Sequence, residues 1–464
     1  MATAVKKNSV DLTEGGIFKN LLKFSLPLVA TSILQLLFNA ADMVVVGQWV
    51  GDDALGAVGC TTALVNLILN LFIGMSGGAG IVLARAYGAK NKEFAERALH
   101  TAMIVSVFSG IAVTVLGVSM SGVMLEWMGT PEANLEMAKT YLMIYFAGSI
   151  FNLVYNFGAS MLRAMGDTIR PFRFLVIGGV LNVIVNIIAV TVFNMGVAGV
   201  ALATIFSQAV SAVLVILTLF KEGAYYVTLN KKKFKVDLGA LKDTMRMGIP
   251  GGLNGMMFSL SNILIQSVLN SYGDVVVAGC ATSGTIEGFY FVAFQSFHIG
   301  VLNIVSQNYG AKRFDRIKKC QVVSVLTIII ECAAISGLLL LFKEPLFRLF
   351  TDTEDVMLAG FERFDLIVST YVICALMGLA SESIRGMNVS LPPTIITMLG
   401  TCLFRVIWVF TVVPLVPGVQ TVYLGMVISW VITGIAQYVL LLCVYKRKKQ
   451  AFAKEVEQAQ VPTV

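Results

Sequence analysis

Long apolar runs recur along the whole chain, and they limit its fold more than any other feature of the sequence. Each run has about twenty residues or more, enough for a helix to cross a hydrocarbon core roughly 30 Å thick. Hydrophobic residues make up 57% of the 464 positions and charged residues 13%, and the mean hydropathy is +0.82. So little polar surface cannot cover a water-soluble globule. The sequence therefore predicts an all-α, polytopic membrane protein.

The apolar runs predict twelve transmembrane helices. Their approximate boundaries are Phe24–Val46, Ala54–Gly78, Ala98–Leu125, Ala138–Arg163, Phe172–Phe193, Val197–Phe220, Met247–Asn270, Val275–Ser306, Val322–Phe342, Phe364–Ile384, Thr394–Val416 and Val422–Val444.

Most of the 34 Lys and Arg residues lie at the two termini and in every second connection between spans. Because basic residues resist translocation, this distribution predicts that both termini lie in the cytoplasm. We expect a multi-pass protein of the cell's inner (plasma) membrane, with no cleaved signal peptide. The net charge of +7 is spread over short loops, which indicates contact with anionic lipid headgroups rather than nucleic acid.

The sequence contains two matching halves. ARAYGAKNKE holds Tyr87 and SQNYGAKRFD holds Tyr309, which are 222 residues apart. MLRAMGDTIRP and SIRGMNVSLPP place Arg163 and Arg385 at the same separation. The chain is therefore predicted to be two copies of a six-helix unit. An even number of spans gives both copies the same orientation, so they form parallel bundles related by a pseudo-two-fold axis along the membrane normal.

This duplication predicts the domain organisation. Residues 1–220 form an N-terminal six-helix lobe, 221–240 a basic cytoplasmic linker, and 241–464 a C-terminal six-helix lobe with a short basic tail. Duplicated halves of this kind commonly enclose a substrate site near the membrane midplane and alternate its access, which favours a transporter. A structural membrane protein that arose by duplication is the simpler alternative.

No constellation typical of a membrane-embedded enzyme is present, and no GxxxxGK[ST] loop indicates direct use of ATP. The seven Cys form no CxxC pair and are interpreted as small buried residues rather than disulfides or metal ligands. The two His are too far apart in the sequence to indicate a metal site. We therefore expect neither an enzyme nor a bound cofactor.

Asp42 lies inside the first apolar run, in LLFNAADMVVVGQW. An isolated ionised carboxylate at membrane depth costs roughly 3 kcal/mol on insertion scales, so it should face a wet cavity, hold a cation or carry a proton. Burial favours the neutral form and a nearby cation favours the ionised form, so one Asp can exchange a proton or Na⁺. A register 220 residues on places Asn262 at the equivalent position of the second half. A hydrogen bond that serves helix packing is the alternative.

Several stretches together resemble the multidrug and toxic compound extrusion (MATE) family. They are LPLVATSILQLLFNAADMVVVGQWVGDDALGAVG, LRAMGDTIRP, LNVIVNIIAV followed by GVAGVALATIFSQ, IEGF and SQNYGAK. The resemblance covers essentially all twelve spans. It implies two six-helix bundles across a V-shaped cleft, and an antiporter that exports amphipathic, often cationic compounds in exchange for inward H⁺ or Na⁺.

By this resemblance, Asp42, Asn182, Asn186 and Thr204 match the family's N-terminal cation site. Asn182 and Asn186 are four residues apart and share a helix face. Many prokaryotic members carry Asp where Asn186 stands, so this chain offers a single carboxylate. Proton coupling through Asp42 is at least as plausible as Na⁺ coupling, although amide oxygens also suit a hard cation.

Other polar and aromatic residues are candidates for the substrate cavity. Glu287 lies in the eighth span, where contact with a cationic substrate and a role in helix packing remain equally open. The others share the fourth span, where ring faces could attract a cation, although packing is the commoner role of such residues; they are Tyr141, Tyr145, Asn152, Tyr155 and Asn156.

We expect a monomer in a lipid membrane that exports small, drug-like organic compounds and binds no metal other than a possible Na⁺ at Asp42. A flippase for lipid-linked precursors would have the same architecture. Such flippases tend to need a strongly basic cavity, and Arg405 is the one deep basic residue that the sequence suggests.

Overall fold

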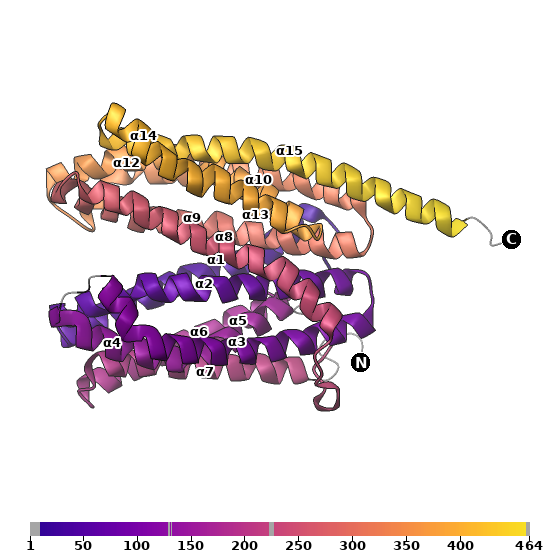
Figure 1. Ribbon diagram of the computed structural model, residues 1–464, viewed down its shortest axis with the longest axis horizontal. Coiled ribbons are helices and arrows are strands. Elements are labelled where there is room, and N and C mark those ends of the chain that lie inside the picture. The colour runs from indigo at the N-terminus through magenta and orange to yellow at the C-terminus, as the bar shows by residue number, and fades with distance from the viewer. Residues whose placement is uncertain (1–9, 129, 131, 222–226, 461–464) are drawn as a thin grey trace. The chain divides into compact units, whose positions relative to one another are not determined.

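Every regular element in the described part of the chain is helical (Figure 1). The computed structural model describes residues 10–460 except 129, 131 and 222–226. The long helices match the predicted spans in order and are α1 (Ile17–Trp49), α2 (Asp52–Gly88), α3 (Lys92–Trp127), the pair α4 (Glu132–Ala147) and α5 (Ser149–Ala164), α6 (Ile169–Thr191), α7 (Gly196–Phe220), α8 (Leu238–Asn270), α9 (Asp274–Gly310), α10 (Phe314–Leu341), α12 (Glu354–Gly386), the pair α13 (Leu391–Thr397) and α14 (Phe404–Leu415), and α15 (Val419–Gln460).

Most of these helices can cross a membrane. In the described residues, ten helices are long and apolar enough, with α13 and α14 taken as one, and the bent pair α4 and α5 makes an eleventh. The remaining long helix, α8, carries Asn254, Asn262 and Gln266 among its apolar residues, which lower its hydropathy. Large apolar side chains such as Phe108 and Ile330 are exposed on the helix surfaces. Lipid tails, rather than protein, solvate such side chains.

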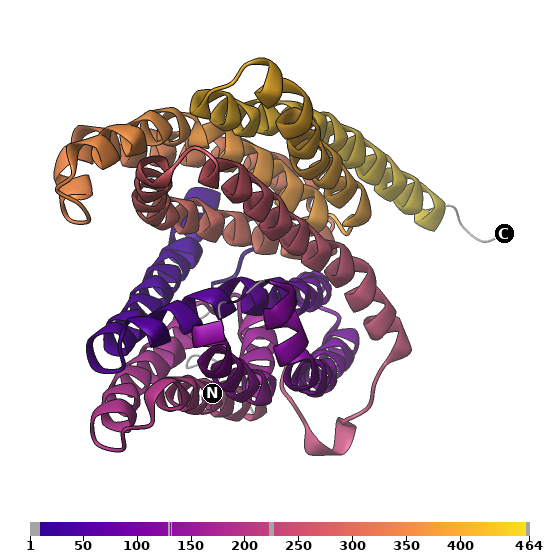
Figure 2. The ribbon, with the colours of Figure 1, turned by 60° about the vertical axis from the view of Figure 1, so that its left-hand side comes forward.

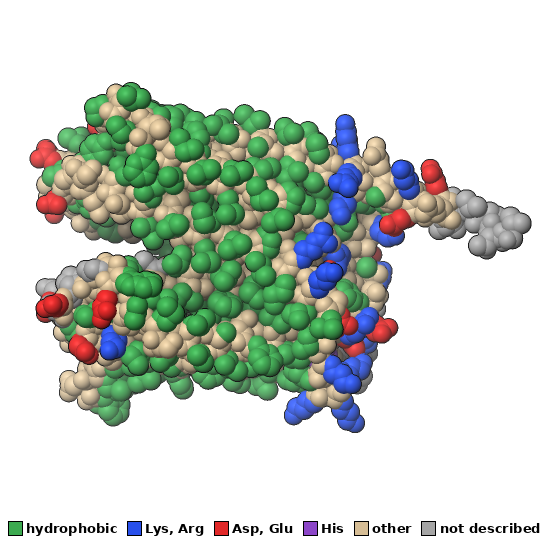
Figure 3. Space-filling model, viewed as in Figure 1, with side chains coloured by type: hydrophobic (Ala, Val, Ile, Leu, Met, Phe, Trp, Pro, Cys, Tyr) green, Lys and Arg blue, Asp and Glu red, His purple; other side chains and the backbone are tan. Residues whose placement is uncertain are grey.

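Most of the helices extend several residues beyond the predicted spans at one end or both, because hydropathy marks the hydrocarbon layer while caps mark the helix ends. At the start of α3, the side chain of Asn91 accepts a hydrogen bond from the Phe94 N–H at 3.0 Å. On each unit's visible face, hydrophobic side chains cover the sides of the helices while Lys and Arg gather near one set of helix ends (Figure 3). The short α11 (Lys343–Arg348) was not predicted.

The chain divides into two compact units. Leu26–Met256 form the first unit together with Val10 and Asp11. Leu12–Ser25 form the second unit together with the described residues from Met257 onward. This division differs from the predicted one at residues 12–25 and 221–256, because the first part of α1 and the first part of α8 each pack with the other half of the sequence. Figure 2 shows the helices of the first unit gathered together, with several of them seen nearly end-on.

Glycines bring α8 against α2 inside the first unit. A Cβ atom at Gly74 would collide with the backbone of Gly252, and one at Gly78 would collide with Gly248. The second unit repeats this arrangement, since a Cβ atom at Gly300 of α9 would meet the side chain of Ser25 in α1. Gly78 and Gly300 are 222 residues apart, so the duplication seen in the sequence also appears as a repeated close helix contact.

We predict that Gly78→Ala destabilises the protein by about 1–3 kcal/mol, because the new methyl group must displace the backbone of α8. Gly77→Ala is the matched control, since a Cβ atom there meets nothing within 4 Å. That control should change stability by no more than about 1 kcal/mol. Thermal unfolding of both variants in detergent measures the difference, and equal unfolding temperatures would refute the close contact.

The fourth predicted span is broken at Gly148 into α4 and α5, which are bent by 48°. A Cβ atom at Gly148 would overlap Ile205 of α7, so the glycine lets α7 approach the bend. Thr114 of α3 donates a hydrogen bond to the carbonyl of Phe146 at 2.9 Å. A hydroxyl thus satisfies a carbonyl next to the break, as buried backbone in a membrane requires.

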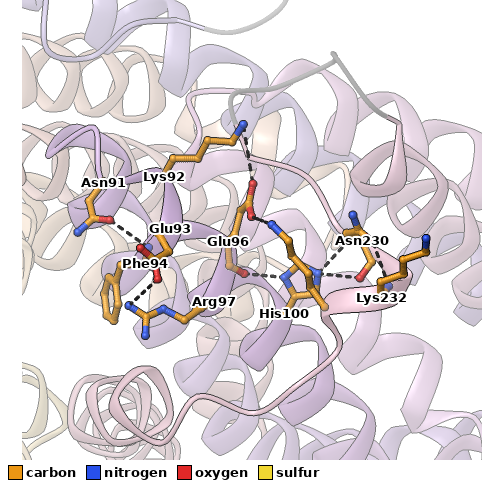
Figure 4. Close-up of polar contacts among 10 residues, drawn as sticks. Asn91, Lys92, Glu93, Phe94, Glu96, Arg97, His100, Asn230 and Lys232 are labelled. Atoms are coloured by element: carbon orange, nitrogen blue, oxygen red, sulfur yellow. Dashed lines mark hydrogen bonds and ion pairs between the residues drawn. The ribbon is translucent and has the colours of Figure 1, made fainter.

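The described part of the predicted linker is held on α3 (Figure 4). The N–H of Asn230 donates a hydrogen bond to Nε2 of the buried His100 at 2.9 Å, and His100 Nδ1 lies 2.7 Å from the carbonyl of Glu96. Lys233 Nζ lies 2.8 Å from the carboxylate of Glu96, and this hydrogen bond and charge raise the pKa of Lys233. Arg97 pairs with Asp237 at 3.1 Å.

We predict that His100→Ala releases the segment around Lys231–Lys233 from α3, because it removes the acceptor for the Asn230 N–H. Trypsin should then cut the folded protein in this basic segment at least several times faster than it cuts the wild type. Lys92→Gln is the control, since it removes an exposed ion pair of 3.9 Å with Glu96 that contributes little. Unchanged cleavage in His100→Ala would mean that His100 does not hold the segment.

Candidate functional site

The first unit brings the four predicted cation-site residues together from three helices. Asn186 of α6 donates a hydrogen bond from Nδ2 to Oδ1 of Asp42 in α1 at 2.7 Å. Asn182, one turn earlier on α6, donates from Nδ2 to Oγ1 of Thr204 in α7 at 3.4 Å. Thr204 in turn donates to the carbonyl of Val200 at 3.1 Å. The residues thus lie as two contacting pairs on one face of α6.

The site offers a ligand mainly oxygen atoms that accept hydrogen bonds or bind a cation. Oδ1 of Asn182 and Oδ1 of Asn186 are both buried, and neither has a hydrogen-bond donor among the residues that the structure describes. A buried acceptor without a donor costs about 1–3 kcal/mol. Together with the Asp42 carboxylate, these oxygens form the donor set that a hard cation prefers. A proton on Asp42 would equally supply a missing hydrogen-bond donor.

Two glycines just before the asparagines explain how α6 reaches its neighbours. A Cβ atom at Gly179 would overlap the ring of Phe38 in α1, and one at Gly178 would collide with the hydroxyl of Ser211 in α7. Phe38 lies one turn before Asp42 on α1. Small residues therefore let α1 and α7 approach α6 closely enough for the polar pairs to form.

Two predicted cavity residues on α4 lie beside the site. The rings of Tyr141 and Tyr145 are stacked with centroids 6.1 Å apart. Both phenols lie within electrostatic range of the Asp42 carboxylate, and Tyr145 also hydrogen-bonds with Gln208 of α7. The structure therefore places aromatic side chains near the acid, while their predicted contact with substrate stays a prediction.

The candidates on α5 lie beyond the bend at Gly148. Nδ2 of Asn156 donates to both the carbonyl and Oδ1 of Asn152, each at 2.9 Å. The hydroxyl of Tyr155 donates to the carbonyl of Pro171 at 3.1 Å, and its ring belongs to a buried apolar cluster. These contacts give Tyr155 a packing role, and the predicted cavity role of all three residues stays untested.

Glu287 lies in the second unit, and both of its carboxylate oxygens accept hydrogen bonds. Arg363 of α12 binds it with two parallel hydrogen bonds, Nε to Oε1 at 3.0 Å and Nη2 to Oε2 at 2.9 Å. Ser283 donates to Oε1 at 2.5 Å and Tyr371 donates to Oε2 at 3.3 Å. A bidentate pair with two further donors leaves the carboxylate little capacity for a substrate. Arg363 was missed in the sequence because it lies one residue outside the predicted tenth span.

Cysteines and histidines contribute no metal site in the described residues, where no group of three or more His, Cys, Asp or Glu side chains converges. Five described cysteines are buried and Cys443 is exposed, and all six are free thiols. The side chain of Cys60 lies outside the described ones.

We predict that Glu287→Gln destabilises the protein by about 3–5 kcal/mol, because it leaves the largely buried Arg363 guanidinium without a counter-charge. The double variant Glu287→Leu with Arg363→Met should recover most of that loss. Glu344→Gln is the control, since its ion pair with Arg348 is exposed and contributes less than about 1 kcal/mol. The unfolding temperature of each variant tests this prediction. If Glu287→Gln unfolds at the wild-type temperature but transports poorly, Glu287 contacts the substrate instead.

Comparison with known proteins identifies the family. The MatE family model matches residues 27–188 and again residues 250–411, once in each half. The chain belongs to the MatE family. The family consists of membrane transporters, and the double match agrees with the duplication seen in the sequence.

Relatives and a solved structure extend this similarity over nearly the whole chain. The probable multidrug resistance protein YpnP of Bacillus subtilis is 26% identical over 85% of this chain and 88% of its own length. The probable multidrug resistance protein NorM of Thermotoga maritima is 24% identical over 95% of both chains. A crystal structure of a MATE protein in the bent conformation superposes with a TM-score of 0.89 at 23% identity, over 95% of this chain and 98% of that one. The predicted fold, twelve transmembrane helices in two bundles, is thereby confirmed.

Proposed function

We propose that this MatE family transporter is a secondary antiporter. It exports amphipathic, cationic drug-like compounds in exchange for inward H⁺ or Na⁺, by alternating access. Several relatives carry names as multidrug resistance or export proteins, which supports efflux of this kind. The coupling rests on the contact between Asp42 and Asn186, the observation in this chain that carries the proposal.

The contact suggests how ion binding could change the first unit. An ionised Asp42 accepts the hydrogen bond from Asn186 Nδ2. A proton on the carboxyl turns one of its oxygens into a donor, and the acceptor oxygens of Asn182 and Asn186 then become its preferred partners. Sodium would draw the same amide oxygens toward the carboxylate. Either ion adds a contact between the carboxyl group and these amide oxygens, which changes how α1 packs against α6.

Ion binding at Asp42 would also change how strongly the substrate is held. The stacked rings of Tyr141 and Tyr145 lie on the neighbouring α4 within electrostatic range of Asp42. Neutralising the carboxylate removes an attraction for a cationic compound held at these rings. The incoming ion and the outgoing cation thus compete for one negative charge, which couples their movements.

The remaining features of the proposal concern the protein's setting. It acts as a monomer in the plasma membrane, with lipids and a small organic substrate as its partners and no cofactor. Within each unit, Lys and Arg gather near one set of helix ends, which supports cytoplasmic termini (Figure 3).

We predict that Asp42→Asn abolishes gradient-driven efflux, lowering it at least about 100-fold, because the amide binds neither a proton nor Na⁺ as a carboxylate does. The assay follows export of a fluorescent cation from proteoliposomes in which ΔpH and ΔpNa are imposed separately. The gradient that drives the wild type identifies the coupling ion. Asp365→Asn is the control, since that carboxylate is exposed and pairs with Lys343 at 2.7 Å. Full coupled efflux in Asp42→Asn would end the proposal.

A further inference from the structure

The second unit buries an arginine without a carboxylate. Arg405 of α14 is 2% exposed, and its Nε donates to Oγ of Ser429 in α15 at 3.1 Å. Neither Nη1 nor Nη2 has a hydrogen-bond partner among the described residues, and no ion pair involving Arg405 occurs among them. Arg405 therefore differs from Arg363, whose charge is matched by Glu287.

The surroundings of the guanidinium are aromatic. Its central carbon lies 5.9 Å from the ring of Phe258 in α8 and 5.9 Å from the ring of Trp430 in α15. Ring faces attract a cation and offset part of the cost of burying it. They offer no acceptor to the N–H groups. Trp430 adds one more donor without an acceptor, because its own Nε1 is buried and has no partner in the part of the chain that the structure describes.

Burying this many donors is costly. Each buried donor without a partner costs about 1–3 kcal/mol, and more when it is charged. Three donor nitrogens, two on Arg405 and one on Trp430, share this condition. Such a cluster has the polarity that a carboxylate or phosphate requires, since the planar guanidinium binds either group with two parallel hydrogen bonds.

The backbone next to Arg405 is also irregular. Residues Met398–Leu403, which join α13 to α14, form a π-helical turn. Such turns are rare inside helices and are frequent at functional sites. Gly400 within the turn lies directly against Thr433 of α15, where a Cβ atom would collide with the threonine hydroxyl. The turn therefore presents Arg405 beside the same helix that carries Ser429 and Trp430.

We propose that Arg405 and Trp430 bind an anionic group, a carboxylate or phosphate, that the transported compound itself carries. This inference rests on the proposed function and deepens it, because it adds zwitterionic and acidic amphipathic compounds to the substrates. The guanidinium and the indole N–H hold the anion, while the rings of Phe258 and Trp430 contact the flat, apolar part of the compound.

Two dyes that differ at a single carboxylate test the proposal. Rhodamine 110 carries a free carboxylate and rhodamine 123 is its methyl ester. Fluorescence anisotropy with the purified full-length protein measures binding of each dye. The wild type should bind the acid about 10-fold more tightly than the ester or better, and Arg405→Met should weaken binding of the acid about 10- to 100-fold. Binding of the ester should change less than about 2-fold.

Further variants separate binding from a structural role. Trp430→Phe keeps the ring and removes the N–H, so it should weaken binding of the acid alone by a few fold. Arg447→Met is the matched control, because Arg447 is exposed on α15. Without dye, Arg405→Met should unfold at the same temperature as the wild type or higher, since an apolar side chain replaces a charge without a counter-charge. A lower unfolding temperature with equal loss of both dyes would overturn the proposal.

Two further arms identify the source of the anion. The competitors are inorganic phosphate and vesicles containing phosphatidylglycerol, whose headgroup carries a phosphate. If either one displaces rhodamine 110 from the wild type but not from Arg405→Met, while the acid is no better bound than the ester, the substrate assignment fails. Efflux of rhodamine 123 under an ion gradient tests the proposed function separately, since the ester lacks the anion.

Discussion

Close approach between helix backbones is the constraint on which the structure depends. Lipid tails are as apolar as the helices themselves, so helices associate in a membrane through tight packing and hydrogen bonds rather than through the hydrophobic effect. Gly74 and Gly78 let α8 reach the backbone of α2, and Gly179 lets Phe38 of α1 lie against α6. The hydrogen bond between Asp42 and Asn186 lies about two turns further along α6 from this second contact, which brings α1 and α6 close together.

Features that repeat locally in the sequence were predictable, and features that depend on distant partners were not. Each predicted span corresponds to one long helix or one helix pair, because a long apolar run has no other stable state in a membrane. The contact of Asp42 with Asn186 was anticipated by family resemblance. The break at Gly148 was not, since it depends on Ile205 of α7 and Thr114 of α3, which only packing brings together.

The two copies have kept the fold and changed the chemistry. In the register that pairs Arg163 with Arg385, the positions of Asn182 and Asn186 correspond to Phe404 and Trp408 in the second copy. Those residues supply no amide oxygen, so the cation site of the first unit has no equivalent there. The neighbouring Arg405 adds buried donors in place of buried acceptors. At these corresponding positions, the first unit thus offers oxygen acceptors and the second offers nitrogen donors.

A charge buried in a membrane protein can be matched permanently or temporarily. Glu287 and Arg363 match each other through fixed hydrogen bonds, and such a pair serves the fold because neither member can leave. No ion pair involves Asp42 or Arg405 among the described residues. Their charges are expensive unless a mobile partner arrives, and a mobile partner is what a transporter moves. The distinction between fixed and absent counter-charges therefore separates the residues that hold this protein together from those that we propose bind its cargo.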